Sequence, residues 1–150
     1  MPNFKTFTDE NNIYSVDMMM AYVNQDHPVS IKVPLAEIDW QLDQVVWGTY
    51  SPRQVMEKPH TKKYAENRES IRKADLSFPI FMTSQYKIID GYHRLIKATE
   101  MKQETIKAYI FSPTLMRKFI INKNRDFVQV HQNMKIYELL ELYRKRFEKT

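Results

Sequence analysis

The stretch of sequence that decides the fold is Lys87-Ile88-Ile89-Asp90-Gly91-Tyr92-His93-Arg94-Leu95-Ile96-Lys97-Ala98. It begins with a short apolar run that ends in an acidic residue, as a buried strand often does. After Gly91 the residues Leu95, Ala98 and Met101 recur at three-residue intervals, which is typical of a helix. The sequence therefore predicts a strand, a tight turn at the glycine and the start of a helix.

The predicted turn has the chemistry of an anion-binding site. The start of a helix carries unpaired backbone N–H groups and a partial positive charge, so a phosphate group can bind there. Gly91 lets the backbone approach such an anion closely. Arg94 can bind phosphate oxygens through its planar fork, and His93 can donate from its ring nitrogens. With Tyr92 and Lys97, these residues form the predicted nucleotide-binding or phosphate-binding set.

Asp90 is the predicted catalytic or metal-binding residue. At the carboxyl end of a strand, its carboxylate can hold a metal ion, a ribose hydroxyl or a reacting proton. The alternative is that Asp90 only caps the helix and that His93 and Arg94 lie in its first turn without a functional role. Cations at that position oppose the helix dipole, which favours the functional interpretation.

Three blocks of the sequence together resemble the ParB/sulfiredoxin-like superfamily. They are Asp-Gly-x-His-Arg at 90–94, Val33-Pro34-Leu35-Ala36-Glu37-Ile38, and Phe78-Pro79-Ile80 just before the motif strand. A further strand at 104–110 follows in the order that the superfamily has, and the likeness covers about Ser30 to Phe111. The resemblance implies an α+β fold in which helices surround a small mixed sheet. The general layout outside the motif is similar to that of ParB-like proteins of large DNA viruses and algae.

The resemblance also implies a ligand. In that superfamily the glycine turn and its His-Arg pair bind nucleotide phosphates, so ATP, ADP or CTP is the expected ligand, with Mg²⁺ at Asp90. Members that phosphorylate a small molecule have an acidic general base shortly after a Pro-Leu-x-x-Ile step, and Asp43 stands at a similar distance after Ile38. The alternative for Asp43 is a solvated helix carboxylate.

The chain departs from two patterns of the superfamily. Sulfiredoxin needs a cysteine where this chain has Tyr92, so its reductase chemistry cannot be carried over. The longer arginine-rich pattern of chromosome-partitioning ParB and a helix-turn-helix after the motif are both missing from the sequence. These departures argue against DNA clamping driven by CTP.

The remaining elements follow from hydrophobic periodicity and capping residues. We expect a loose arm over Met1–Asn12. Helices are predicted from a Ser15 cap through Asn24, from a Ser51 capping box through Glu57, and over 64–73, 113–119 and 136–147. Strands near 30–33, 77–82, 87–89 and 105–111 should share one sheet. The prediction is a single domain over 1–150, with a core at about 30–111.

Two apolar features of the sequence have alternative interpretations. The last helix carries an apolar stripe of Ile136, Leu139, Leu140, Tyr143 and Phe147, and we expect it to pack on the core. A contact in a homodimer is its alternative. The tryptophans Trp40 and Trp47 are assigned to core packing rather than to stacking on a nucleobase.

Composition excludes several classes of protein. The 150 residues are 43% hydrophobic and 27% charged, which is typical of a globular domain. Cysteine is absent, so a disulfide scaffold, a thiol nucleophile and cysteine-ligated zinc are excluded. With two glycines the chain has neither a Walker loop nor a dinucleotide fingerprint. No apolar run approaches the roughly 18 residues of a membrane span, so we expect an intracellular protein, cytoplasmic or nuclear, without a membrane partner.

Three functional hypotheses follow. The first is a nucleotide-binding domain, with Mg²⁺-dependent phosphotransfer to a small hydroxyl-bearing molecule, or nucleotide hydrolysis, as its enzymatic form. The second is a DNA-binding or nuclease-type module, in keeping with the net charge of +5 and with Lys62, Lys63, Arg72 and Lys73. The third is a non-catalytic interaction protein that has kept the fold.

Overall fold

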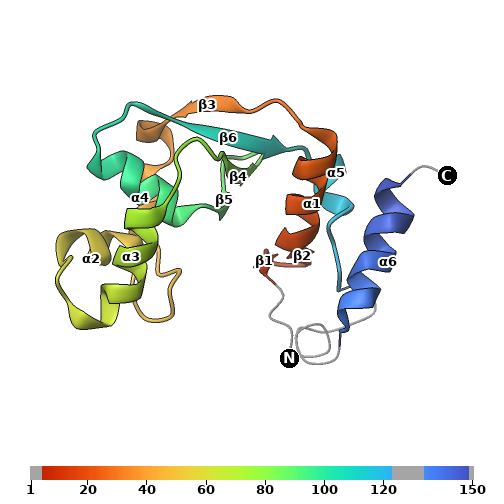
Figure 1. The fold of residues 1–150 in the computed structure, drawn as a ribbon, viewed down its shortest axis with the longest axis horizontal. Helices are drawn as coiled ribbons and strands as arrows, with labels where there is room; N and C mark the ends of the chain where they lie inside the picture. Colours follow the sequence, from red (N-terminus) through yellow and green to blue (C-terminus); the bar gives the residue numbers. More distant parts are fainter. Residues whose placement is uncertain (1–4, 123–133, 149–150) are drawn as a thin grey trace. The chain divides into compact units, whose positions relative to one another are not determined.

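The computed structural model describes residues 5–122 and 134–148, which belong to two compact units. One unit comprises Met1–Pro28 and Ser112–Thr150, and the other is Val29–Phe111. The stretch that resembles the ParB/sulfiredoxin-like superfamily lies inside the second unit. The described chain is a mixed α+β structure (Figure 1).

The unit Val29–Phe111 is built on a four-stranded sheet with the order β3-β6-β4-β5. The strands are β3 (Ile31–Pro34), β4 (Ile80–Thr83), β5 (Ile88–Asp90) and β6 (Thr105–Phe111). Strand β6 pairs antiparallel with β3 and parallel with β4, and β5 pairs antiparallel with β4. The predicted mixed sheet is therefore confirmed, with all four predicted strands in it. Pro34 is the last residue of β3.

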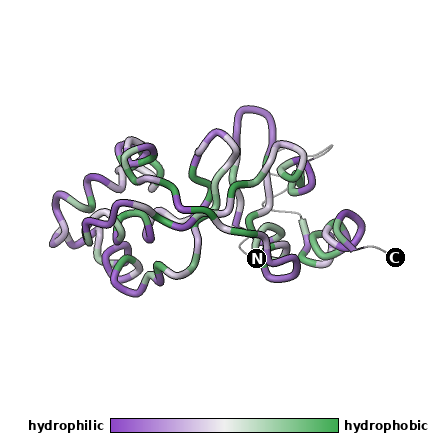
Figure 2. Tube along the Cα trace, turned by 90° about the horizontal axis from the view of Figure 1, so that it is seen from above, coloured by the Kyte–Doolittle hydropathy of each residue, from purple (hydrophilic) through white to green (hydrophobic). Residues whose placement is uncertain are grey.

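The same unit contains the α-helices α2 (Pro52–Glu57), α3 (Ala65–Lys73) and α4 (Tyr92–Glu100). It also contains the 3-10 helices η1 (Leu35–Glu37), η2 (Asp39–Asp43) and η3 (Lys62–Tyr64). Ser51 and Gln54 form the predicted capping box of α2. Helix α4 buries Leu95, Ile96 and Ala98 in a core shared with residues of the sheet such as Ile80 and Met82. Figure 2 shows both hydrophobic and hydrophilic residues along the helices, as expected of helices that cover a core on one side.

The other unit begins with a small hairpin of β1 (Thr6–Thr8) and β2 (Ile13–Ser15). The prediction of a loose arm over Met1–Asn12 is therefore wrong for Thr6–Thr8. Asp9 closes the turn, because its carboxylate accepts hydrogen bonds from the backbone N–H groups of Asn11 and Asn12 and from the Tyr14 hydroxyl. Ser15 caps helix α1 (Val16–Asp26), as predicted, by accepting a hydrogen bond from the Met18 N–H.

The C-terminal helix α6 (Ile136–Phe147) packs within the same unit, which also contains α5 (Pro113–Arg117). The Phe147 ring stacks on Phe119 at 5.5 Å and lies 5.6 Å from Tyr22 of α1. The predicted apolar stripe is only partly buried, since Leu139 is buried but Ile136 and Leu140 are 59% and 60% exposed.

Candidate phosphate-binding turn

The Gly91 turn between β5 and α4 requires glycine for two reasons. Its φ of +122° is rarely adopted by residues with a side chain. A Cβ at this position would also lie only 2.7 Å from the Cβ of Ile80 in β4. Gly91 is the N-cap of α4, and its carbonyl accepts the hydrogen bond of the Leu95 N–H at 2.9 Å. The turn is thus packed directly on the sheet, and the helix begins with a fixed orientation.

Arg94 folds back over this turn and pairs with Asp90. Its Nη2 atom lies 3.1 Å from Asp90 Oδ2 and 3.1 Å from the position that a Gly91 Cβ would occupy. The two charged side chains are only 15% and 16% exposed, and the guanidinium lies 5.0 Å above the centre of the Phe78 ring. Burial lowers the pKa of Arg94, while the Asp90 carboxylate and, more weakly, Asp75 oppose that shift. The cation in the first turn of α4 is therefore compensated by a partner in the preceding strand.

Asp75 and Lys97 lie beside this pair. The Ser77 hydroxyl and N–H donate to Asp75 Oδ1 at 2.7 and 2.9 Å, which lowers the pKa of Asp75, and Lys97 and Arg94 add to that effect. Lys97 Nζ donates to the carbonyls of Arg72 and Ala74 at 2.9 and 2.7 Å. The ammonium that the sequence assigned to phosphate binding thus holds the end of α3.

His93 points into a separate polar network. Its Nε2 lies 2.9 Å from Asn67 Oδ1, and Asn67 Nδ2 donates to the Tyr50 hydroxyl at 2.7 Å. The imidazole stacks on the indole of Trp47, with ring centroids 4.9 Å apart and an angle of 25°. Because Asn67 donates its amide hydrogen to Tyr50, its oxygen accepts from His93, which places a proton on Nε2. Tyr92 lies alongside, and burial raises the pKa of its hydroxyl.

Two polar residues of this region were not singled out from the sequence. Asn67 lies three residues after Tyr64 and four residues before Ile71, and both of these residues are buried. This helical spacing places Asn67 on the buried face of α3, and it is the signal in the sequence that could have identified the residue. Gln41 is fully buried, and its side chain donates to the Tyr86 carbonyl at 2.6 Å and accepts from the Ile88 N–H at 2.8 Å. Gln41 thereby fixes the start of β5, the strand that delivers Asp90.

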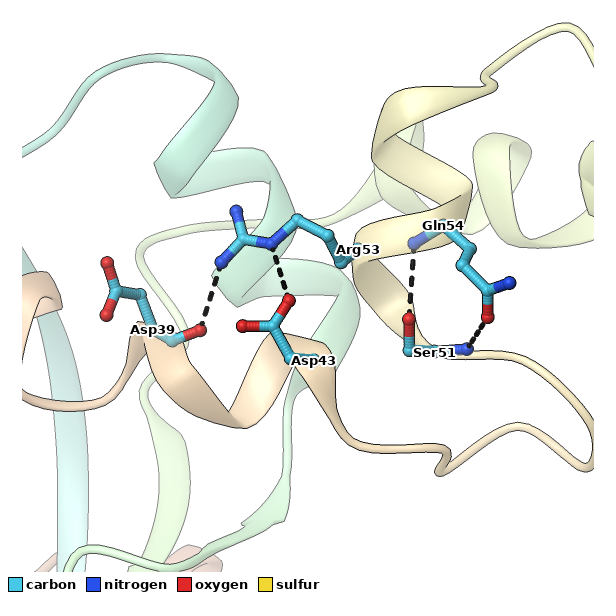
Figure 3. A network of polar contacts seen from close by, with 5 residues as sticks. All are labelled: Asp39, Asp43, Ser51, Arg53 and Gln54. Carbon is cyan, nitrogen blue, oxygen red and sulfur yellow. Dashed lines mark hydrogen bonds and ion pairs between the residues drawn. The ribbon is translucent and has the colours of Figure 1, made fainter.

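Asp43, the predicted general base, has a different environment. Figure 3 shows its carboxylate facing Arg53 of α2, with Nε 3.0 Å from Oδ1. Arg53 also donates to the Asp39 carbonyl at 3.3 Å. The Asp43 side chain is 62% exposed. This geometry matches the solvated carboxylate that the sequence analysis gave as the alternative, and the role of base stays a prediction.

A metal ion at Asp90 would depend on a bound ligand. Within residues 5–122 and 134–148, no group of three or more His, Cys, Asp or Glu side chains is arranged to hold a metal. Mg²⁺ commonly binds through one or two carboxylates together with the phosphates of a nucleotide. Asp90 fits the carboxylate of such a set, but a site made by the protein alone does not fit the described residues.

The basic residues assigned to DNA contact are partly engaged within the protein. Arg72 Nε donates to Glu69 at 3.0 Å and Lys73 Nζ lies 3.4 Å from the same carboxylate. These hydrogen bonds, chiefly from Arg72, lower the pKa of Glu69 to about 2. Lys63 Nζ lies 5.7 and 5.3 Å from the ring centres of Tyr50 and Tyr64.

No protein-family model, curated protein or solved structure matches this chain. In the ranges that the structure describes, every helix is too short or too polar to cross a lipid bilayer. The functional argument therefore rests on the geometry around Gly91. Chemically, that arrangement offers a helix start, one guanidinium, one imidazole and one carboxylate.

Proposed function

We propose that Val29–Phe111 is a ParB/sulfiredoxin-like domain whose Gly91 turn binds the phosphate groups of a nucleotide such as ATP, ADP or CTP. The observation that carries this proposal is the position of the Arg94 guanidinium, 3.1 Å from the site of a Gly91 Cβ. A planar fork is thereby held over the start of a helix, where backbone N–H groups and the helix dipole also attract an anion.

Binding would involve an exchange of partners at Arg94. In this structure the guanidinium pairs with Asp90 Oδ2 at 3.1 Å, and a phosphate oxygen would take over or share that contact. The guanidinium can form two parallel charge-assisted hydrogen bonds to a phosphate, and the phosphate can also accept from the backbone N–H groups of the turn, which favours the exchange. Asp90 would then be positioned to hold Mg²⁺ bound to the same phosphates.

Phosphoryl transfer would need a base in addition to the phosphate site. Asp43 is the predicted base, and it is exposed and paired with Arg53. We therefore propose nucleotide binding as the function, with transfer to a small hydroxyl-bearing acceptor as its catalytic extension. Release of ADP from ATP in the presence of candidate acceptors would detect that extension.

The test compares Arg94→Ala with a matched change at an arginine of α3 that pairs with the C-terminal end of α4. Arg68 forms a bidentate pair with Glu100 at 3.0 and 3.1 Å, so Arg68→Ala removes an ion-paired arginine without touching the turn. Each protein is titrated with ATP, ADP and CTP by calorimetry, with and without Mg²⁺, at a temperature where it is folded. A ligand at 100 times its dissociation constant should add about 2.7 kcal/mol of stability to the wild type.

The expected result is that wild type and Arg68→Ala bind nucleotide and that Arg94→Ala does not. Equal binding by folded Arg94→Ala would exclude the Gly91 turn as the phosphate site. Failure of the wild type to bind any nucleotide would refute the proposed function itself.

A further inference from the structure

Aromatic rings gather beside the first turn of α4. The Trp47 indole stacks on His93 at 4.9 Å, and its centroid lies 6.2 Å from that of Tyr50 and 6.3 Å from that of Tyr92. Tyr50 in turn lies 4.7 Å from Tyr64. We call Trp47, Tyr50, Tyr64 and Tyr92 the aromatic cluster. Since His93 belongs to the first turn after Gly91, the aromatic cluster adjoins the proposed phosphate site.

The segment that carries Trp47 is a tight turn with open space on one side. The Trp47 N–H donates to the Tyr50 carbonyl at 3.2 Å, which closes the turn around Gly48. Apart from Gly48 and its two chain neighbours, no residue has a heavy atom within 4 Å of the position that a Gly48 Cβ would occupy. Trp47 and Tyr50 are half-buried, while Gly48 and Thr49 are exposed. The turn thus faces open space at Gly48, and Trp47 beside it is partly accessible.

We infer that Trp47 is the stacking surface for the base of the bound nucleotide, an inference that rests on the proposed function. In a nucleotide one ribose separates the base from the first phosphate, so an aromatic surface for the base must lie beside the phosphate site. Trp47 meets that condition through its contact with His93. Every nucleobase has a π face, so stacking accepts purines and pyrimidines alike.

The edge of the aromatic cluster offers polar contacts to such a base. The Tyr50 hydroxyl accepts a hydrogen bond from Asn67 at 2.7 Å, and its own hydrogen gives it donor capacity toward a ring nitrogen or carbonyl oxygen. Lys63 lies 5.7 Å from the centre of the Tyr50 ring and adds positive charge beside the aromatic cluster. The ligand class is thus a nucleoside phosphate rather than a bare polyphosphate.

The first experiment separates the base from the phosphates. Wild type, Trp47→Leu and Trp40→Leu are titrated with ATP and with inorganic tripolyphosphate, which lacks a base. Trp40 is the matched control, because it is 53% exposed and lies in the neighbouring η2. Trp47→Leu should bind ATP roughly 5- to 150-fold more weakly, as expected for loss of one stacked base, and should bind tripolyphosphate like the wild type. Trp40→Leu should bind both ligands normally.

The second experiment does not depend on the folding of a Trp47 variant. The chain has two tryptophans, so Trp40→Phe leaves Trp47 as the single indole fluorophore. ATP should change the Trp47 emission strongly at saturation, and saturating tripolyphosphate should leave it nearly unchanged.

The outcomes distinguish this inference from the proposed function. Equal loss of ATP and tripolyphosphate binding in Trp47→Leu would mean that Trp47 acts by holding His93, and the base would be bound elsewhere. An unchanged ATP affinity in that variant, or identical emission changes with both ligands, would also overturn the inference while leaving the phosphate site in place. Absence of binding of both ligands to the wild type would remove the proposed function and the inference together.

Discussion

Replacing Arg94 by alanine should destabilise the unit Val29–Phe111. The change leaves the Asp90 carboxylate, which is 16% exposed, without its guanidinium partner. A buried polar group that loses its partner costs about 1–3 kcal/mol, and more when the group is charged. The lost contact of Arg94 with the Phe78 ring adds roughly 0.5–2 kcal/mol. Breaking a fully buried ion pair costs about 3–5 kcal/mol, so we expect about 2–4 kcal/mol here.

This magnitude is larger than the sequence alone suggests. A cation in the first turn of a helix opposes the dipole, so the sequence alone predicts that removing Arg94 costs the fold little. The structure shows a largely buried pair with Asp90, and loss of that ion pair outweighs the unfavourable dipole term of about 0.3–1 kcal/mol.

The assay is urea unfolding followed by circular dichroism for wild type, Arg94→Ala, Asp90→Ala and the double variant. The double-mutant cycle should give a favourable coupling of about 1–3 kcal/mol between the two side chains. Arg68→Ala is the control, because the Arg68–Glu100 pair is about twice as exposed and should contribute about 1 kcal/mol or less. An unfolding free energy of Arg94→Ala within about 0.5 kcal/mol of wild type, or purely additive effects, would refute the reasoning.

Three further predictions concern the turn and its neighbours. Gly91→Ala should destabilise the fold by about 2–5 kcal/mol through backbone strain and overlap with Ile80. Gly48→Ala is the control, since the added Cβ would lie in open space, and it should cost only about 1 kcal/mol in the same urea assay. In the wild type, Mg²⁺ should increase the affinity for ATP, and Asp90→Asn should lose most of that increase because an amide is a poor ligand for Mg²⁺. If calorimetry shows the same increase in the variant, Asp90 is excluded as the metal-binding carboxylate. If DNA is the main partner, replacing Lys62, Lys63, Arg72 and Lys73 with alanine should flatten the dependence of affinity on salt concentration, and DNA binding that barely responds to salt would count against that hypothesis.

Much of the second unit could be predicted from local patterns. The strand-glycine-helix order around Gly91 and the capping box at Ser51 are encoded within a few residues, and the structure has both. The sequence did not predict the hairpin of Thr6–Thr8 and Ile13–Ser15, since its strands are short and its turn depends on several hydrogen bonds to Asp9. Short elements that depend on such contacts leave little periodicity in the sequence.

The neighbours of the turn were harder to predict, because they come from distant parts of the chain. The sequence can place His93 and Arg94 in the first turn of a helix, but their partners Asn67, Phe78 and Trp47 lie on other elements. Lys97 shows the same limit, since its two carbonyl partners become neighbours only when α3 packs on α4. Spacing along one helix indicates which side of the helix a residue occupies, but the residues that its side chain contacts depend on tertiary packing.

Arg94 and His93 at the start of α4 are each restrained by a partner from elsewhere in the unit. Arg94 is compensated by Asp90, and His93 is held by Asn67, so both side chains are held in place without a ligand. A bound anion must therefore compete with the single negative charge of Asp90 for the Arg94 guanidinium. A polyphosphate carries several negative charges and can contact the backbone N–H groups as well, whereas chloride or a weakly charged ester cannot offer both. Under the proposed function, the Asp90–Arg94 pair should therefore favour polyphosphates over small anions, which is the selectivity that a nucleotide site would require.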